Sequence, residues 1–396
     1  MRWEELRGGA VNIEVEAHLR QIVESGKQLR VKLGIDPSAP DLHLGHTVVL
    51  RKMRQFQEAG HTAVLIIGDF TARIGDPSGR SETRKPLTEL EVEENGETYL
   101  QQFSRVMDRE RTEVRRQSEW FGGMDLSEVI RLAGRSTVAR LLQREDFTQR
   151  MEAGHSIGLH ELLYPLLQGY DSIAVQSDLE LGGTDQLFNL LFARDVQRDA
   201  GREPQDVLTM PLLEGLDGKQ KMSKSLNNYV ALTDPPAEMF GKLMSLPDEL
   251  IVRYLRLVTA LPGARVDEVE RELAAGSNPR DAKALLASEV VRMYHGAHAA
   301  AEAEEGFVRQ FREGGAPDQM EEVFLPAGVE GGSVATTLMV TALASSKNEA
   351  RRLVAQRGVR LNGRTVEDPE EVYRPADGDV WQVGRRRYVR VRLGAS

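Results

Sequence analysis

Residues 31–68 follow the pattern of a strand, a helix and a second strand. Residues 31–35, Val-Lys-Leu-Gly-Ile, fit a short strand, 45–59 carry apolar residues at helical spacing, and 62–68 are an apolar run. Strands joined through a helix are parallel, and such crossovers are right-handed in nearly all proteins. The pattern therefore predicts an α/β fold built around a parallel sheet.

Ligands of open parallel sheets bind beyond the carboxyl ends of the strands. Asp36 and the loop 37–45 follow the first predicted strand, while Asp69 and the turn 75–79 follow the second. We expect these segments to meet at one edge of the sheet. The place of a functional site is thus predicted independently of its chemistry.

The 396 residues, 40% of them hydrophobic, are enough for two or three domains. Residues 85–155 are rich in Arg and Glu and are expected to form a mostly helical insertion with a candidate dimer surface. The pattern after Pro235 is helical to about Met320, and the passage 326–332, rich in Gly and Pro, is typical of a linker.

Composition excludes several classes of protein. The chain has no cysteine, so it has neither disulfides nor thiolate metal sites, and its 8 histidines show paired spacing only at His43 and His46. No run approaches the roughly 20 apolar residues of a membrane span, and the first residues lack the layout of a secretory signal. We expect a cytoplasmic protein with no membrane contact and no protein-bound metal.

Charge is unevenly distributed along the chain. The net charge is −10, yet residues 333–396 hold 12 Lys and Arg against 7 Asp and Glu. A basic tail on an acidic body is typical of local contact with a polyanion such as RNA.

The loop 37–46 contains His43 and His46 on either side of Gly45, at the expected start of a helix. Unpaired N–H groups and the positive end of the helix dipole favour an anion there, and glycine lets a flat base approach the backbone. The alternative is a pair of half-buried histidines that cap the helix.

A second loop contains three lysines within six residues, Lys219, Lys221 and Lys224, together with Ser223 and Ser225. Flexible cations suit a polyphosphate whose charge moves toward a leaving pyrophosphate. The alternative is a solvated basic turn. The two loops taken together favour the phosphate interpretation.

Tyr164, Gln168 and Asp171 lie at positions i, i+4 and i+7 of an otherwise apolar helix. A narrow polar stripe on such a helix favours the lining of a small-ligand pocket. A hydrogen-bonded polar stripe within the core is the alternative.

A glycine turn opens the next helix with Gly183, Asp185 and Gln186. This Asp can accept from ribose hydroxyls and this Gln can donate to a carboxylate, although helix capping is an equally good account. Asp76 is similarly either a turn residue or an anion that meets a ligand ammonium group.

These motifs resemble those of the bacterial tyrosyl-tRNA synthetases, which are class I aminoacyl-tRNA synthetases. The loop at His43–His46 is similar to the His-Ile-Gly-His signature, and Lys221–Ser225 matches the Lys-Met-Ser-Lys-Ser signature letter for letter. The turn 75–79, the Tyr164 to Asp171 helix and the turn at Gly183 match the tyrosine-specific pattern. Residues 333–396 resemble the S4-like RNA-binding domain of the family.

The resemblance implies three domains. A Rossmann-like parallel-sheet catalytic domain is expected over 1–230, a helical domain on the anticodon side over 231–325, and a small α+β S4-like domain over 333–396. It also implies ATP with Mg²⁺, L-tyrosine and tRNA(Tyr) as partners of a homodimer.

The resemblance further assigns roles to residues. His43, His46, Lys221 and Lys224 are expected to be catalytic. The remaining roles are ATP binding by Asp36, Gly45, Gly183, Asp185, Met222, Ser223 and Lys224; tyrosine binding by Asp76, Tyr164, Gln168, Asp171 and Gln186; a pyrophosphate loop with Arg80 and Arg84; and tRNA binding by Lys347, Arg351, Arg352, Arg357 and Arg360.

One position departs from many family members, which have a tyrosine on the first strand where this chain has Lys32. Lys32 is expected either to donate to the phenol oxygen or to pair with Asp171. Two other functions remain open from the sequence: a tryptophanyl-tRNA synthetase, which shares the signatures, and an RNA-binding relative without charging activity.

Overall fold

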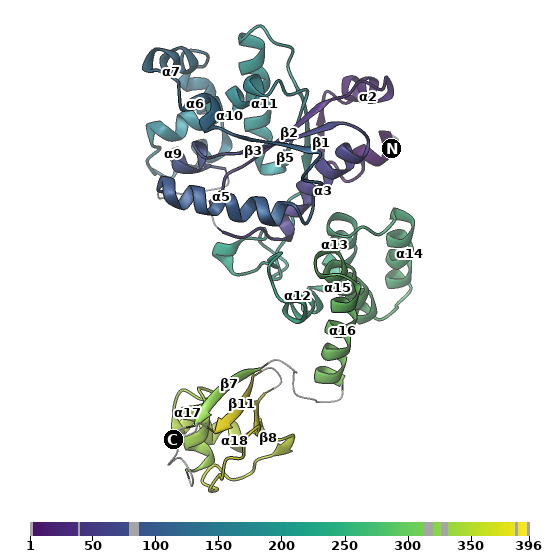
Figure 1. Cartoon of the computed structure of the whole chain (residues 1–396), viewed down its shortest axis with the longest axis vertical. Coiled ribbons are helices and arrows are strands. Elements are labelled where there is room, and N and C mark those ends of the chain that lie inside the picture. Colours follow the sequence, from purple (N-terminus) through teal and green to yellow (C-terminus); the bar gives the residue numbers. More distant parts are fainter. Residues whose placement is uncertain are drawn as a thin grey trace. The chain divides into compact units, whose positions relative to one another are not determined.

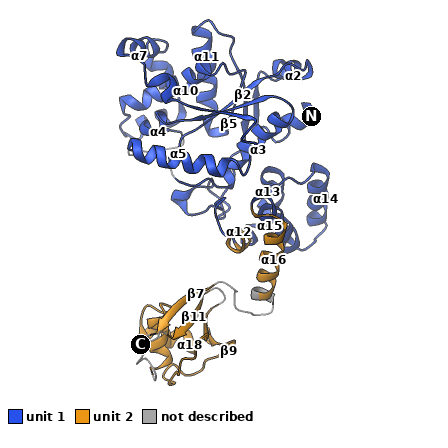
Figure 2. Ribbon diagram, viewed as in Figure 1, with its two compact units in different colours: residues 1–235, 242–294 blue, residues 236–241, 295–396 orange. Residues whose placement is uncertain are grey.

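A computed structural model describes residues 3–38, 40–78, 87–312, 320–325, 332–384 and 387–393. The chain forms two compact units, one of residues 1–235 and 242–294 and the other of residues 236–241 and 295–396 (Figure 2). Arg80 and Arg84 lie outside the described residues. The predicted division into three domains at 230 and 333 stays a prediction.

The first unit contains a six-stranded sheet in the order β1-β6-β5-β2-β3-β4. All neighbours are parallel except β1, which pairs antiparallel with β6. The strands are β1 (Asn12–Glu14), β2 (Arg30–Ile35), β3 (Thr62–Ile67), β4 (Thr112–Arg116), β5 (Leu179–Gly183) and β6 (Asp206–Met210). The predicted parallel strand–helix–strand unit is confirmed as β2, α3 (Leu44–Glu58) and β3.

The direction of chain progress reverses between β2 and β5. After β2 the chain adds β3 and β4 on one side, and it then returns to add β5 and β6 on the other. Loops leaving β2 and β5 therefore diverge at the carboxyl edge, which opens a crevice for a ligand.

Helices cover both faces of this sheet. Figure 1 shows α10 (Leu159–Ala174) and α11 (Leu187–Asp199) on one side and α3 with α5 (Glu89–Phe103) on the other. The remaining helices of the unit are α1 (Trp3–Arg7), α2 (Glu16–Glu24), α4 (Thr71–Ile74), α6 (Ser118–Phe121), α7 (Leu126–Ala133), α8 (Val138–Leu141), α9 (Glu145–Glu152), α13 (Ile251–Val258) and α14 (Gly263–Ala274), with short 3₁₀ turns at Thr184–Gln186, Lys224–Leu226 and Asp248–Leu250. Two helices cross the division between the units, α12 (Pro236–Met244) and α15 (Pro279–His295).

The segment 85–155 is mostly helical, as its composition predicts, but it also contributes a strand to the sheet. Its strand β4 pairs in parallel with β3 and completes the sheet. The strand has the sequence Thr-Glu-Val-Arg-Arg, in which only Thr112 is buried. A charged edge strand of this length carries almost no hydrophobic alternation, so composition hides it.

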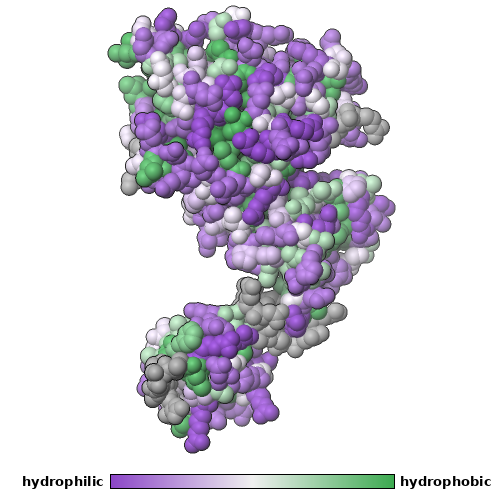
Figure 3. Space-filling view, in the orientation of Figure 1, coloured by the Kyte–Doolittle hydropathy of each residue, from purple (hydrophilic) through white to green (hydrophobic). Residues whose placement is uncertain are grey.

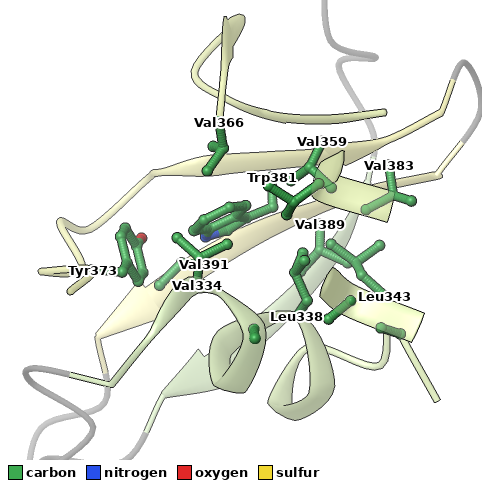
Figure 4. Packing of buried hydrophobic residues seen from close by; sticks show 14 of the residues in the cluster. Val334, Leu338, Leu343, Val359, Val366, Tyr373, Trp381, Val383, Val389 and Val391 are labelled. Carbon is green, nitrogen blue, oxygen red and sulfur yellow. The ribbon is translucent and has the colours of Figure 1, made fainter. Parts of the chain in front are cut away.

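The second unit contains α16 (Ala297–Arg312) and a five-stranded sheet in the order β7-β11-β10-β8-β9. Its elements are β7 (Glu321–Leu325), α17 (Val334–Val340), α18 (Lys347–Ala355), β8 (Val359–Leu361), β9 (Arg364–Thr365), β10 (Val380–Val383) and β11 (Arg387–Leu393). Figure 4 shows Trp381 at the centre of its core, among Val334, Val359 and Val391. The Tyr373 ring meets Trp381 edge-on, with ring centroids 4.9 Å apart.

Strand β7 corrects one boundary expected from the sequence. It lies within 231–325, the range expected to be helical, but it pairs in parallel with β11 over five residues. The C-terminal sheet therefore includes residues 321–325. Across the described residues, every helix is either too short or too polar to cross a membrane.

Candidate active site

A cavity of about 590 Å³ lies at the carboxyl edge of the first sheet, where the chain reverses between β2 and β5. It gathers residues from Leu33 to Ser225, which are 192 positions apart in the chain. The sequence-predicted residues that line it are Asp36, His43, Gly45, His46, Asp76, Tyr164, Gln168, Asp171, Gly183, Asp185, Gln186, Lys221, Met222, Ser223 and Lys224.

The two histidines form one wall of the cavity at the start of α3. Their ring centroids are 3.9 Å apart, and His46 Nδ1 accepts the backbone N–H of His43 at 3.2 Å. Burial lowers the pKa of His46 to about 4, so the ring is neutral near pH 7 and its proton lies on Nε2. Burial, with the cationic neighbours, also holds the pKa of His43 well below its ordinary value.

Gly45 has a steric reason to be glycine. A Cβ atom at this position would lie 2.9 Å from His43 Cε1 and 3.0 Å from His43 Nδ1. Any side chain would therefore displace the His43 ring. The close approach of the His43 ring therefore requires glycine at position 45, whether or not a nucleotide base also packs there.

The Lys221–Ser225 loop forms the opposite wall. Asn228 holds its base: Oδ1 accepts from Ser223 N at 2.8 Å, and Nδ2 donates to Asp217 Oδ2 at 2.9 Å. Lys221 Nζ lies 3.2 Å from Asp185 Oδ2. Sequence reasoning missed Asn228 and Asp217, which carry no recognisable motif.

Lys224 is the cation of this loop that turns inward. Its Nζ atom is buried and has no hydrogen-bond partner among the described residues, and burial lowers its pKa. A buried ammonium group without a partner is costly, and an anion in the cavity would relieve this cost.

Asp171 lies on α10 and lines one end of the cavity. Its Oδ2 accepts from Gln117 Nε2 at 2.7 Å and its Oδ1 accepts from Trp120 Nε1 at 3.0 Å. Burial raises its pKa to about 7, against the opposing effects of Lys32 and these two hydrogen bonds. Gln117 and Trp120 come from the segment after β4, where no local pattern marks them.

Of the two contacts expected of Lys32, the structure contradicts the pairing with Asp171, and donation to the phenol oxygen stays a prediction. The Lys32 Nζ atom lies 2.9 Å from Glu180 Oε1, and both side chains are buried. The expected pairing with Asp171 is therefore wrong, and the ammonium group is engaged beneath the cavity. The partner was missed because Glu180 lies on a neighbouring strand far along the chain.

Carboxylates occupy the middle of the cavity. Asp76 Oδ1 accepts from Ser78 N at 2.8 Å, and Asp76 Oδ2 accepts from Gln186 Nε2 at 2.7 Å. Tyr164 donates its hydroxyl to Asp36 Oδ2 at 2.8 Å. This region is anionic, whereas the wall at Lys224 is cationic.

Arg144 supports this middle region from the segment after β4. Its side chain is only 3% exposed, and it donates to Asn189 Oδ1 at 3.0 Å while lying 3.5 Å from Asp76 Oδ1. The sequence did not single out Arg144, because the residues around it have the composition of an ordinary charged helix.

The predicted tRNA-binding residues lie in the second unit. Lys347, Arg352 and Arg360 are exposed, while Arg351 and Arg357 pair with Glu370 and Glu367 at 2.8 and 3.3 Å. Among the described residues there is no cluster of three His, Asp or Glu side chains that could hold a metal ion.

Comparison with known proteins gives consistent matches. A family model described as tRNA synthetases class I (W and Y) matches residues 24–312, and one described as S4 domain matches residues 339–379. The chain is 51% identical over 390 residues to the tyrosine–tRNA ligase of Thermotoga maritima, covering 98% of this chain and 96% of the relative. It is also 51% identical over 392 residues to that of Moorella thermoacetica, covering 98% and 94%.

Solved structures share the fold. The C-terminally truncated mitochondrial tyrosyl-tRNA synthetase of Aspergillus nidulans has a TM-score of 0.67 at 22% identity, covering 78% of this chain and 93% of that one. The enzyme of Archaeoglobus fulgidus complexed with L-tyrosine has a TM-score of 0.62 at 23% identity, covering 76% and 98%.

Proposed function

The chain belongs to the class I tyrosyl-tRNA synthetases, and from this premise we propose how its cavity carries out the reaction. ATP and L-tyrosine give tyrosyl-adenylate and pyrophosphate, and the tyrosyl group then passes to a ribose hydroxyl of the 3′-terminal adenosine of tRNA(Tyr), with AMP as the leaving group. The observation that carries the proposal is that a single cavity joins the buried Asp171 to the cations of the 221–225 loop.

The phosphate end stabilises charge that moves. An oxygen of the tyrosine carboxylate attacks the α-phosphorus, the bond from that phosphorus to the bridging oxygen breaks, and pyrophosphate leaves with the electron pair. Lys224 and Lys221 face the departing pyrophosphate, and the neutral His46 donates Nε2–H to a phosphate oxygen. Fixed donors aimed at developing charge are the main source of catalysis without a protein nucleophile.

The nucleoside lies against Gly45 and Gly183, and Asp185 accepts from the ribose hydroxyls. The ion pair between Asp185 and Lys221 then opens, which frees the lysine for phosphate. Met222, Ser223 and Asp36 complete the ATP site. Mg²⁺ enters with ATP, because Mg²⁺ is usually held through substrate phosphates with few protein ligands.

The amino-acid end recognises tyrosine by its two polar groups. Asp171 accepts the phenol hydroxyl, and Asp76, Tyr164 and Gln168 surround the ammonium group, with Gln186 near the carboxylate. Phenylalanine would leave the buried Asp171 without its third donor, a kind of discrimination for which these synthetases are the standard example.

ATP–pyrophosphate exchange with tyrosine, tryptophan and phenylalanine tests the proposal, followed by charging of tRNA(Tyr). Exchange that depends on tyrosine and a tyrosine-charged tRNA are expected. Exchange with tryptophan alone would contradict the role of Asp171, and tRNA binding without any exchange would contradict the whole assignment.

We also propose that the enzyme is a cytoplasmic homodimer. Its segment 118–159 exposes large apolar side chains, Leu126, Ile130, Val138, Met151 and Leu159, each more than half exposed. Figure 3 shows hydrophobic surface at the edge of the molecule where Figure 1 draws α7. Exposed apolar side chains concentrated on one segment are typical of a protein interface.

The exposed basic residues of the C-terminal sheet domain, Lys347, Arg351, Arg352, Arg357 and Arg360, are proposed to contact tRNA phosphates. The proposal is supported by the match of residues 339–379 to the S4 domain and by the excess of basic residues after 333.

A further inference from the structure

Lys32 and Glu180 form a fully buried ion pair next to Gln168, a residue that lines the cavity. They are register partners on the adjacent parallel strands β2 and β5, and their exposed fractions are 0% and 1%. The desolvation of two such charges often outweighs their attraction, and apolar replacements of buried pairs are often as stable. Stability alone therefore gives no reason for this pair.

The remaining contacts of the pair converge on α10. Lys32 Nζ donates to Ser172 Oγ at 2.7 Å and to the backbone oxygen of Gln168 at 3.0 Å. Glu180 Oε1 accepts from Gln168 Nε2 at 3.1 Å, and its other oxygen accepts from Gln205. The pair thus holds both the backbone and the side chain of one cavity-lining residue.

This contact fixes which end of the Gln168 amide faces the ligand. A carboxylate only accepts hydrogen bonds, so the amide nitrogen must face Glu180. The amide oxygen then has no acceptor role among the described residues. Gln168 Oε1 is buried and without a hydrogen-bond partner in the described part of the chain. Gln168 itself lines the cavity. An orphaned acceptor in a site for an amino acid fits an ammonium group.

We propose that the buried Lys32–Glu180 pair is a positioning device for the substrate: it holds the Gln168 amide with its oxygen toward the ammonium group of tyrosine. The inference rests on the proposed function of the cavity. In the absence of the pair the amide is free to rotate, and a rotated amide presents its NH₂ group to the ammonium group.

The two charges must be removed together in a test. Lys32 favours the ionised form of Asp171 and lowers its pKa, while Glu180 raises that pKa, so a single substitution perturbs the phenol end as well. Replacing both leaves no unpaired buried charge.

The test is a double-mutant cycle in the full-length enzyme, measured by ATP–pyrophosphate exchange. In Lys32→Met/Glu180→Leu, the KM for tyrosine is expected to rise on the order of 10-fold, the usual scale for one hydrogen bond to a charged group. The kcat and the KM for ATP should change less than about 2-fold. Gln168→Ala should raise the KM by a similar factor in the wild type but add little in the pair variant.

Arg150 and Glu161 provide a matched control. They form another buried pair, 2.7 Å apart and each 2% exposed, and neither lines the cavity. Arg150→Met/Glu161→Leu should leave the KM for tyrosine within about 2-fold of the wild type.

An unchanged KM for tyrosine in the Lys32/Glu180 variant would overturn the proposal, as would an equal effect of Gln168→Ala in both backgrounds. If that variant does not fold, Lys32→Gln/Glu180→Gln also removes both charges, with polar side chains of similar volume. A Gln at 180 can present either its oxygen or its NH₂ group to Gln168, so the orientation of the Gln168 amide is no longer fixed. This variant should raise the KM for tyrosine several-fold, and no rise overturns the proposal too. Loss of tyrosine activation in the wild type would instead contradict the proposed function.

Discussion

Lys224 is the residue whose loss should be most visible in the chemical step. Its buried Nζ atom has no partner in the described part of the chain, so it is already desolvated and aimed for an anion. Lys224→Ala is expected to lower kcat for tyrosine activation by about 10²- to 10³-fold, the usual scale for losing one donor to the transition state. ATP–pyrophosphate exchange measures this directly.

Lys219 is the control for this prediction. It lies in the same loop, but its side chain is exposed and does not line the cavity. Lys219→Ala should change exchange by less than about 3-fold. Equal losses in both variants would mean that the loop supplies only general positive charge.

The raised pKa of Asp171 leads us to expect that selection of tyrosine over phenylalanine depends on pH. The pKa of Asp171 is raised to about 7 in the free enzyme, and the ionised carboxylate is the form that accepts the phenol hydroxyl. Because ionisation increases as pH rises, the ratio of kcat/KM for tyrosine to that for phenylalanine should increase about 10-fold from pH 6 to 8. The ratio cancels titrations of ATP and of the shared ammonium group.

Asp171→Asn cannot ionise and should abolish this pH dependence of the ratio. A ratio that is constant with pH in the wild-type enzyme would show that Asp171 keeps one protonation state throughout this range.

Site residues were predictable from the sequence only where they belong to a short local motif. His43 and Lys224 belong to compact motifs whose spacing is meaningful by itself. Gln117 lines the cavity and Arg144 lies beside the cavity-lining Asp76, both from a charged segment. The Lys32–Glu180 pair depends on strand register, so only tertiary structure reveals these residues.

At the scale of elements, α7 provides a test of the proposed homodimer. Leu126 and Ile130 are one helical turn apart, and both are largely exposed. Leu126→Lys/Ile130→Lys should convert the dimer to a monomer, because two charges in an apolar interface are costly to desolvate. Light scattering after size-exclusion chromatography measures the mass.

Val372 in the C-terminal unit is a comparably exposed apolar residue, and Val372→Lys should leave the mass unchanged. A wild-type enzyme that is monomeric at micromolar concentration would contradict the dimer itself.

Strand β7 decides where the C-terminal domain must be cut. It pairs with β11, so a fragment beginning at Ser333 lacks one strand of its sheet and exposes a bare edge. A chain truncated after Arg312 is expected to keep tyrosine activation within about 3-fold while losing at least about 100-fold in charging, because the proposed contacts of the tail with tRNA phosphates are removed. Exchange and charging assays separate the two activities.

Charging that survives the truncation would contradict tRNA binding by the tail. As an internal comparison, residues 320–396 should give a cooperative unfolding transition, and residues 333–396 should aggregate or unfold at lower temperature.

The sequence predicted helices and strands correctly where one face or both faces of the element are buried, as in β2, α3 and β3, because burial produces a hydrophobic pattern. The pattern failed for β4, whose exposed edge needs no apolar face, and for β7, whose partner lies near the end of the chain. Edge strands take their identity from neighbours, so local sequence does not contain enough information to define them.

At the scale of the whole molecule, charge is divided between an acidic body and a basic tail. Arg352 and Arg360 are exposed in the tail, and replacing both with Gln should lower the slope of log Kd for tRNA against log salt by about 1 for each residue. Tyrosine activation should be unchanged. Arg20→Gln, on the exposed surface of α2, should leave the slope as it is; an equal decrease there would indicate only a general charge effect.

The reversal of chain direction between β2 and β5 also has a consequence during synthesis. The cavity takes Asp36 from one half of the sheet and Lys224 from the loop after the last strand of the other half. A nascent chain that has not yet released residue 225 from the ribosome lacks a complete ATP site, and one that has not yet released residue 180 also lacks the ion pair that contacts Gln168. Ligand-induced stabilisation is therefore absent during most of translation, and it begins only when the complete sheet has emerged.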